Sequence, residues 1–151
     1  MRSKRLRSFI WLLFAGYCAM MLWLLLLHRV GEESQPWRYN LHPGDTIGRY
    51  LWVLRHGCDE LQCRYALANL AGNVGLFLPL GVLLPMLFQN LRKLWPLFML
   101  TTVVIALLEL TQTVTGLGTL DVDDWILNLS GTMLGYFLWL SFSNRNPAAK
   151  T

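Results

Sequence analysis

The chain has 151 residues, of which 54% are hydrophobic and 15% are charged, and its formal net charge is +4. Because soluble domains usually carry about 25% charged residues, this composition excludes an ordinary soluble domain and predicts an integral membrane protein. The basic residues are divided among short polar segments, which indicates a role in membrane topology rather than a nucleic-acid-binding surface. The expected partner is therefore the lipid bilayer and not a nucleic acid.

Four apolar stretches are long enough to cross a hydrocarbon core of about 30 Å as helices. The first follows a basic N-terminus; a cleaved signal peptide is the alternative, but its apolar region would cover only about 7 to 15 residues. Pro79 and Pro85 predict a kink in the second stretch. The predicted fold class is an all-α, integral membrane four-helix bundle in a single domain, 1–151, with spans at about 8–27, 68–88, 94–114 and 125–142.

The polar segment 28–67 is the one sizeable loop between these spans. Within it, Asp45 is expected to cap a short helix that Gly57 ends. The apolar face of this helix would consist of Ile47, Tyr50, Leu51 and Leu54. Such a helix would lie on the membrane surface or pack against the loop's own residues, and the pattern leaves both open. Cys58 and Cys63 lie in the same loop and would form a disulfide in an oxidising compartment.

The basic residues outside the loop predict the orientation of the bundle. In a four-span arrangement they all fall on one side, with no acidic residue among them: Arg2, Lys4, Arg5, Arg7, Arg92, Lys93, Arg145 and Lys150. The positive-inside rule makes that side cytoplasmic. We therefore expect a multi-pass membrane protein with both termini in the cytoplasm, and with segment 28–67 and the turn near Asp121 outside.

Amide and carboxylate side chains are concentrated near the outer ends of the last three spans. Because residues three or four apart share a helical face, Asn69 pairs with Asn73 and Glu109 with Gln112. If the fourth helix begins near Asp121, five more residues share one of its faces: Asp121, Asp124, Asn128, Gly131 and Gly135. A carboxylate in a bilayer is costly unless it is partnered, so this cluster is a candidate site. The candidate ligand-binding residues are Asn69, Asn73, Glu109, Gln112, Asp121, Asp124, Asn128 and Arg64, and we expect no metal site and no cofactor.

Each of these features also has a purely structural interpretation. Asp121, Asp123 and Asp124 could be solvated turn residues that favour the N-terminus of the fourth helix by capping and dipole interaction, and this interpretation is preferred for Asp121 or Asp123. The three asparagines could form hydrogen bonds between helices. Gly131 and Gly135 could mark close helix packing within the chain or the contact of a homo-oligomer. Glu109 is the hardest to explain this way, because its carboxylate needs a proton, a cation or an arginine nearby.

The spacing of these polar residues resembles that of the VanZ-like family, small bacterial membrane proteins named for a teicoplanin-resistance protein. The resemblance covers about residues 40 to 140. It is carried by Asn40-Leu-His-Pro43-Gly-Asp-Thr46-Ile47, Asn69-Leu-Ala-Gly-Asn73-Val-Gly-Leu-Phe77-Leu-Pro79-Leu-Gly81, Glu109-x-x-Gln112 and Asp121-x-x-Asp124-x-x-x-Asn128-x-x-Gly131-x-x-x-Gly135. It implies a cell-envelope protein, with a founding member that lowers sensitivity to glycopeptide antibiotics.

The sequence departs from the family pattern just before the first aspartate of the last motif. Family members commonly carry an arginine there, whereas this chain has Leu117 and Gly118. The counter-charge expected for Glu109 or Asp124 is therefore missing from the turn, and Arg64 is the nearest predicted substitute.

Three functions fit these observations. The preferred one is a non-enzymatic envelope protein that binds the head group of a phospholipid or a lipid-linked cell-wall precursor in an outward-facing polar pocket. The first alternative is a membrane enzyme acting on a lipid-linked substrate through Glu109 and Asp124. The second is a small transporter that would require an oligomer.

Overall fold

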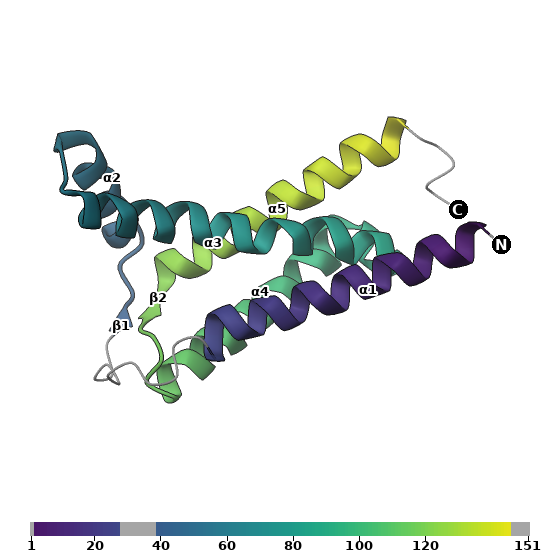
Figure 1. The fold of residues 1–151 in the computed structure, drawn as a ribbon, viewed down its shortest axis with the longest axis horizontal. Helices are drawn as coiled ribbons and strands as arrows, with labels where there is room; N and C mark the ends of the chain where they lie inside the picture. The colour runs from purple at the N-terminus through teal and green to yellow at the C-terminus, as the bar shows by residue number, and fades with distance from the viewer. Residues whose placement is uncertain (1, 28–38, 146–151) are drawn as a thin grey trace.

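The computed structural model describes residues 2–27 and 39–145, and its long helices run between two polar ends (Figure 1). The first helix continues from an α-helix into a π-helical turn. The elements of this first helix are α1 (Arg2–Leu22) and η1 (Trp23–Leu27). The remaining long helices are α3 (Glu60–Leu87), α4 (Leu94–Val114) and α5 (Val122–Arg145), with the 3-10 turn η2 (Gln89–Arg92) between α3 and α4.

Three of the described helices are long and apolar enough to cross a membrane: Lys4–Leu26, Glu60–Leu87 and Leu94–Val114. The described structure is otherwise almost entirely helical, so the all-α class is confirmed. Helix α5 has 24 residues, but polar residues such as Asn128 and Thr132 reduce its hydropathy, and it is not among the three. The fourth crossing, at 125–142, therefore stays a prediction.

Helix α3 begins earlier than the predicted second span. The side chain of Asp59 accepts a hydrogen bond from the backbone N–H of Gln62 at 2.7 Å, which caps the helix at its first turn. The helix then continues through Pro79 and Pro85 to Leu87. Residues 60–67, which were expected in the loop, are therefore helical and extend α3 toward the polar end of the bundle.

The closest helix contact in the core is between α3 and α5. A Cβ atom added at Gly131 would overlap the backbone of Val74, and one at Gly135 would overlap the backbone of Leu78. On the facing side, a Cβ atom at Gly81 would overlap the carbonyl oxygen of Thr132. These glycines let the two backbones approach. The Gly131 and Gly135 face is thus occupied by α3 of the same chain, which corrects its proposed use as an oligomer contact; the oligomeric state itself stays untested.

The described segment 39–56, which precedes α3 in the chain, lies at one end of the bundle (Figure 1). It contains the strand β1 (Tyr39–Asn40), which pairs in parallel with β2 (Leu120–Asp121), and the short helix α2 (Asp45–His56), which packs against α3. Gly57, at φ +96°, ends α2 as expected. The predicted N-cap is wrong by one residue, because Gly44 occupies that position and has no side chain to cap the helix.

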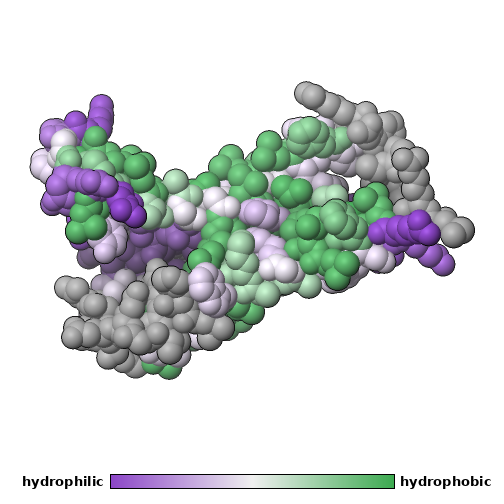
Figure 2. Space-filling model, in the orientation of Figure 1, coloured by the Kyte–Doolittle hydropathy of each residue, from purple (hydrophilic) through white to green (hydrophobic). Residues whose placement is uncertain are grey.

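The two ends of the bundle differ in composition. Elements β1, α2 and β2 lie at one end, and the start of α1, the turn η2 and the end of α5 lie at the other (Figure 1). Hydrophobic residues cover most of the face between them, with the strongest hydrophilic colour at the two ends (Figure 2). The core in the middle is apolar and includes Tyr17, Phe77, Leu84, Leu97, Ile105 and Tyr136.

Candidate functional site

Asp123 supplies the cap that α2 lacks. Its carboxylate accepts hydrogen bonds from the backbone N–H groups of Gly44 at 2.7 Å, Thr46 at 2.8 Å and Ile47 at 3.0 Å. These amides are the unpaired donors of the first turn of α2 and carry the positive end of its dipole. Burial raises the pKa of the Asp123 carboxyl, but the three backbone hydrogen bonds outweigh it and leave the pKa below its usual value. Asp123 therefore fixes α2 to the start of α5.

Asp121 reinforces the same junction. Its carboxylate accepts hydrogen bonds from Thr46 Oγ1 at 2.6 Å and Asn40 Nδ2 at 3.3 Å, and also from the backbone N–H of Asp123 at 2.9 Å. Asp121 is 8% exposed and Asp123 is 0% exposed. The prediction of solvated turn residues is therefore wrong for both. Both carboxylates can be buried because they are paired: Asp121 with donors from β1 and α2, and Asp123 with backbone amides at the start of α2.

A polar cavity of about 410 Å³ opens beside this junction. We call it the polar cavity, and its lining residues are Tyr39, Asn40, Thr46, Arg49, Tyr50, Asn69, Thr119, Asp121 and Asp124. Asp124 accepts a hydrogen bond from Asn73 Nδ2 at 2.7 Å, which connects α5 to α3 at the wall of the cavity. Asn69 Oδ1 is buried and has no hydrogen-bond partner in the described part of the chain. Four predicted residues, Asn69, Asn73, Asp121 and Asp124, are thus brought together here.

Among the described residues, the basic residue that lines the polar cavity is Arg49 and not Arg64. One guanidinium nitrogen of Arg49 donates to Thr46 Oγ1 at 3.2 Å, so the side chain is held on the face of α2 that also carries the bond to Asp121. Arg64 lies on the exposed side of α3 among Leu61, Tyr65 and Ala68, outside the polar cavity. Arg64 therefore does not line the polar cavity, and its role as the counter-charge of Glu109 or Asp124 stays a prediction. The position of Arg49 three residues after Thr46, inside a segment that carries the family resemblance, is the sequence signal that points to it.

Glu109 is buried, at 6% exposure, and lines a separate cavity of about 180 Å³. The walls of this smaller cavity are Leu41, Ala106, Leu120, Asp121, Val122 and Trp125. Glu109 and Asp124 therefore line different cavities, with Asp121 between them. Within residues 2–27 and 39–145, no group of three or more His, Cys, Asp or Glu is arranged to hold a metal ion.

The two remaining predicted residues lie outside the polar cavity. Gln112 donates through Nε2 to the carbonyl oxygen of Leu25 at 2.9 Å, which holds the end of the first helix against α4. Asn128 is 4% exposed, and its Oδ1 atom has no hydrogen-bond partner among the described residues. Gln112 thus has a structural role in this arrangement, and Asn128 faces the protein interior below the cavity lining.

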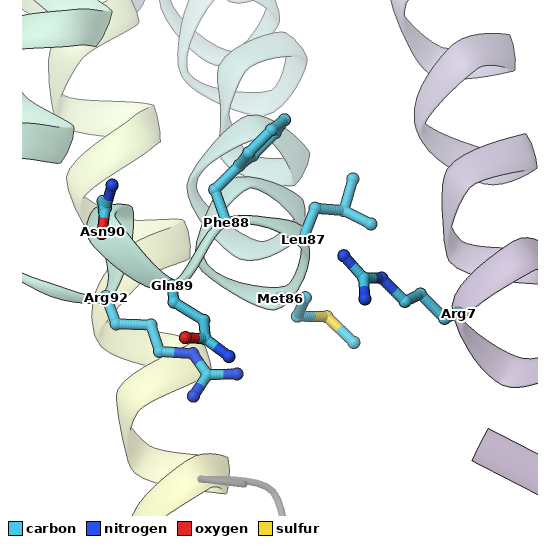
Figure 3. A pocket seen from close by; sticks show the side chains of 7 residues that line it. All are labelled: Arg7, Met86, Leu87, Phe88, Gln89, Asn90 and Arg92. Carbon is cyan, nitrogen blue, oxygen red and sulfur yellow. The ribbon is translucent and has the colours of Figure 1, made fainter. Parts of the chain in front are cut away.

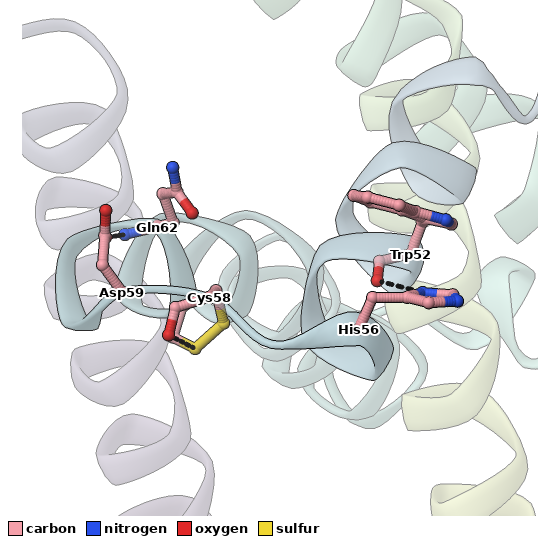
Figure 4. Close-up of a disulfide and its surroundings, with 6 residues drawn as sticks. Trp52, His56, Cys58, Asp59 and Gln62 are labelled. Carbon is pink, nitrogen blue, oxygen red and sulfur yellow. Dashed lines mark hydrogen bonds between the residues drawn. A yellow bond between two sulfur atoms is a disulfide. The ribbon is translucent and has the colours of Figure 1, made fainter.

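A disulfide joins Cys58 and Cys63 between the end of α2 and the first turn of α3 (Figure 4). The two Cα atoms are 5.5 Å apart. Beside it, the rings of Trp52 and His56 stack with their centroids 4.6 Å apart. These contacts restrain the connection that carries α2, and therefore Arg49, next to α3.

Comparison with known proteins identifies one family. A model of the VanZ/LLP1 family matches residues 12–143, which is most of the chain and includes every residue that lines the polar cavity. Neither a curated protein nor a solved structure matches the chain.

Proposed function

We propose that this chain, which belongs to the VanZ/LLP1 family, binds the head group of a lipid or of a lipid-linked cell-wall precursor in the polar cavity. Membership of this family supports a membrane protein of the cell envelope that is similar to glycopeptide-resistance proteins. We further propose that the residues lining the polar cavity contact this head group.

The observation that carries the proposal is the combination of opposite charges in one cavity. Arg49 is a cation with several donors in one plane, which suits a phosphate or carboxylate group. Asp124 places at the cavity wall a carboxylate that also accepts a hydrogen bond from Asn73, and Asn69 adds an amide whose oxygen is unpaired in the described structure. Such a set matches a ligand that carries a phosphate together with amine, amide or hydroxyl groups.

The contacts within the site favour binding over catalysis. Asp123 is committed to three backbone amides, and Asp121 to Thr46, Asn40 and a backbone amide. Glu109 and Asp124, the pair on which the enzyme hypothesis depends, line separate cavities. General acid and base groups must reach the same reacting atoms, so this separation lowers the support for that alternative.

The test is a binding measurement on purified protein in phosphatidylcholine nanodiscs. The probes are a short-chain phosphatidylethanolamine and a polyprenyl-diphosphate disaccharide-peptide precursor. We expect Arg49→Gln and Asp124→Asn each to weaken binding of the preferred probe about tenfold, since a charge-assisted hydrogen bond contributes about 1.5 kcal/mol or more.

Arg64→Gln is the matched control, because it removes the same charge from the neighbouring surface of α3 without touching the polar cavity. It should leave binding within about twofold of wild type, since exposed charges outside a site contribute little. Unchanged binding in a stable Arg49→Gln, Asp124→Asn double variant would contradict the proposal. Glycopeptide susceptibility of cells expressing the same variants at equal abundance shows whether binding is connected with resistance.

A further inference from the structure

A second cavity, of about 450 Å³, lies at the opposite end of the bundle and plays no part in the proposed head-group site (Figure 3). It lies between the start of α1 and the turn η2. Its walls are Arg7, Gln89, Asn90, Arg92 and the segment Met86–Phe88 at the end of α3. We call it the basic cavity, because two guanidinium groups are the charged groups among the described residues that line it.

Arg92 is held in place from two helices. Its Nε atom donates to the carbonyl oxygen of Pro85 at 3.3 Å, and its own carbonyl oxygen accepts a hydrogen bond from the Tyr136 hydroxyl at 2.9 Å. Pro85 lies in the last turn of α3, where carbonyl groups have no amide partner further along the helix. The side chain of Arg92 therefore caps α3, and its backbone is held against α5. Together these contacts hold the guanidinium group at the cavity wall.

The charge around the basic cavity is of one sign. Lys4, Arg5 and Lys93 lie in the same two segments as Arg7 and Arg92, and those segments contain no acidic residue. The acidic residues in the described part of the chain lie elsewhere. Those within 45–60 and 120–124 belong to the other end of the bundle, and Glu109 lies in α4. The amides of Gln89 and Asn90 add neutral donors. An anion at this site would meet donors and positive charge, and none of the described residues that line the cavity carries a carboxylate.

Apolar surface lies directly beside these basic groups. Met86 is 42% exposed and Phe88 is 38% exposed, although both lie at the end of a helix that is apolar enough to span a membrane. Trp11 of α1 packs edge-on against Phe88, with ring centroids 5.4 Å apart. A basic group next to exposed apolar and aromatic side chains at the end of a span suits a ligand with a phosphate head and acyl chains.

We propose that the basic cavity binds a phosphate group, through Arg7, Arg92 and the amide of Gln89. Two sources carry this chemistry: the head group of an anionic phospholipid and soluble phosphate. Basic pockets between membrane helices are a known setting for anionic lipid head groups, and the apolar rim favours that source here. This site does not depend on the proposed function of the polar cavity.

The test uses the full chain in nanodiscs made from equal parts of phosphatidylcholine and phosphatidylglycerol, with retained lipids identified by native mass spectrometry. Wild type should retain phosphatidylglycerol in preference to phosphatidylcholine. Arg7→Gln should reduce that retention about fivefold, as expected for the loss of one basic group at a membrane surface. Gln89→Ala should reduce phosphatidylglycerol retention to a smaller extent. This variant tests the site without changing its charge.

Lys93→Gln is the matched control, since it removes an equal charge one residue from Arg92 without lining the cavity. Retention within about twofold of wild type supports a defined site, whereas a loss equal to that of Arg7→Gln indicates diffuse attraction and overturns the proposal. A second arm adds inorganic phosphate to protein in phosphatidylcholine alone. An Arg7-dependent rise in thermal stability identifies soluble phosphate as the source, and no rise together with Arg7-dependent lipid retention identifies the lipid. Absence of both effects overturns the proposal.

Discussion

The two ends of the bundle use charged residues in opposite ways. At the end formed by β1, α2 and β2, the carboxylates of Asp121 and Asp123 are buried, and their acceptors are filled by Asn40, Thr46 and the first turn of α2. At the other end, Arg7 and Arg92 line a cavity to which no described acidic residue contributes. The first end is therefore assembled by contacts within the chain, whereas the second offers positive charge to an outside anion. The acidic cluster is therefore chiefly a scaffold that joins α2 to the start of α5, next to Arg49, Asn69 and Asp124 of the proposed head-group site.

The largest expected effect comes from separating the helices that connect the two ends. Gly131→Ala places a methyl group against the backbone of Val74, so α3 and α5 must move apart. We expect a loss of about 3 kcal/mol, at the upper end of the usual range for an overfilled core. Thermal unfolding in detergent measures it. The matched control is Gly75→Ala on α3, where a Cβ atom meets nothing within 4 Å; equal stability of the two variants would contradict the assigned helix contact.

Removing the cap on α2 should disrupt the acidic end alone. In Asp123→Ala the amides of Gly44, Thr46 and Ile47 lose their acceptor, and we expect a cost of about 2 kcal/mol. Amide hydrogen exchange should then be at least about tenfold faster across the first turn of α2 and unchanged around η2. Asp45→Ala is the control, because Asp45 is exposed and makes no side-chain cap. Undiminished protection in Asp123→Ala would show that α2 is held by other contacts.

A smaller and more local effect is expected from the disulfide. Cys58 and Cys63 close a short loop, so their removal should reduce stability by no more than about 2 kcal/mol. A Cys58→Ser, Cys63→Ser double variant should loosen the connection between α2 and α3 and weaken head-group binding through Arg49. Limited proteolysis at this connection measures the loosening. Retention of full resistance to proteolysis would mean that the cap of Asp59 on α3 is sufficient.

Acidification should produce the smallest change in stability. It should destabilise the folded chain, because Asp123 has a lower pKa in the folded than in the unfolded state. Its pKa is lowered in the folded chain, so its contribution is complete above the unfolded aspartate pKa of about 3.9 and is lost as pH falls through the lower folded pKa. Unfolding midpoints of wild type and Asp123→Ala should therefore converge below about pH 3.9. A difference that stays constant through this range would show that Asp123 acts by packing and not by charge.

The elements that depend on local pattern could be predicted, and those that depend on distant contacts could not. Hydropathy located the three membrane-capable helices, and the spacing from Asp45 to Gly57 indicated α2. The early start of α3 had a signal in Asp59 and Gln62, three residues apart, which is the spacing of a helix cap.

The role of Asp123 had no such local signal. It caps a helix at positions 76 to 79 residues away along the chain, so only the pairing of β1 with β2 brings the two together. For the same reason the sequence suggested Arg64, which is close to Asn69 in the chain, instead of Arg49, which reaches the cavity from α2. Helical spacing paired Asn69 with Asn73, and the Asn73–Asp124 hydrogen bond then joins this face of α3 to α5. Asp121 was expected on the fourth helix but lies in β2, one residue before α5 begins.

Hydrogen exchange of wild type with and without the polyprenyl-diphosphate precursor tests the central claim most directly. The account predicts slower exchange in peptides covering residues 39–50, which carry Asn40 and Arg49, and no change in peptides covering 86–92 at the basic end. This protection should be absent in Asp124→Asn. Protection confined to residues 86–92, or none in either segment at saturating precursor, would contradict the assignment of the polar cavity as the head-group site.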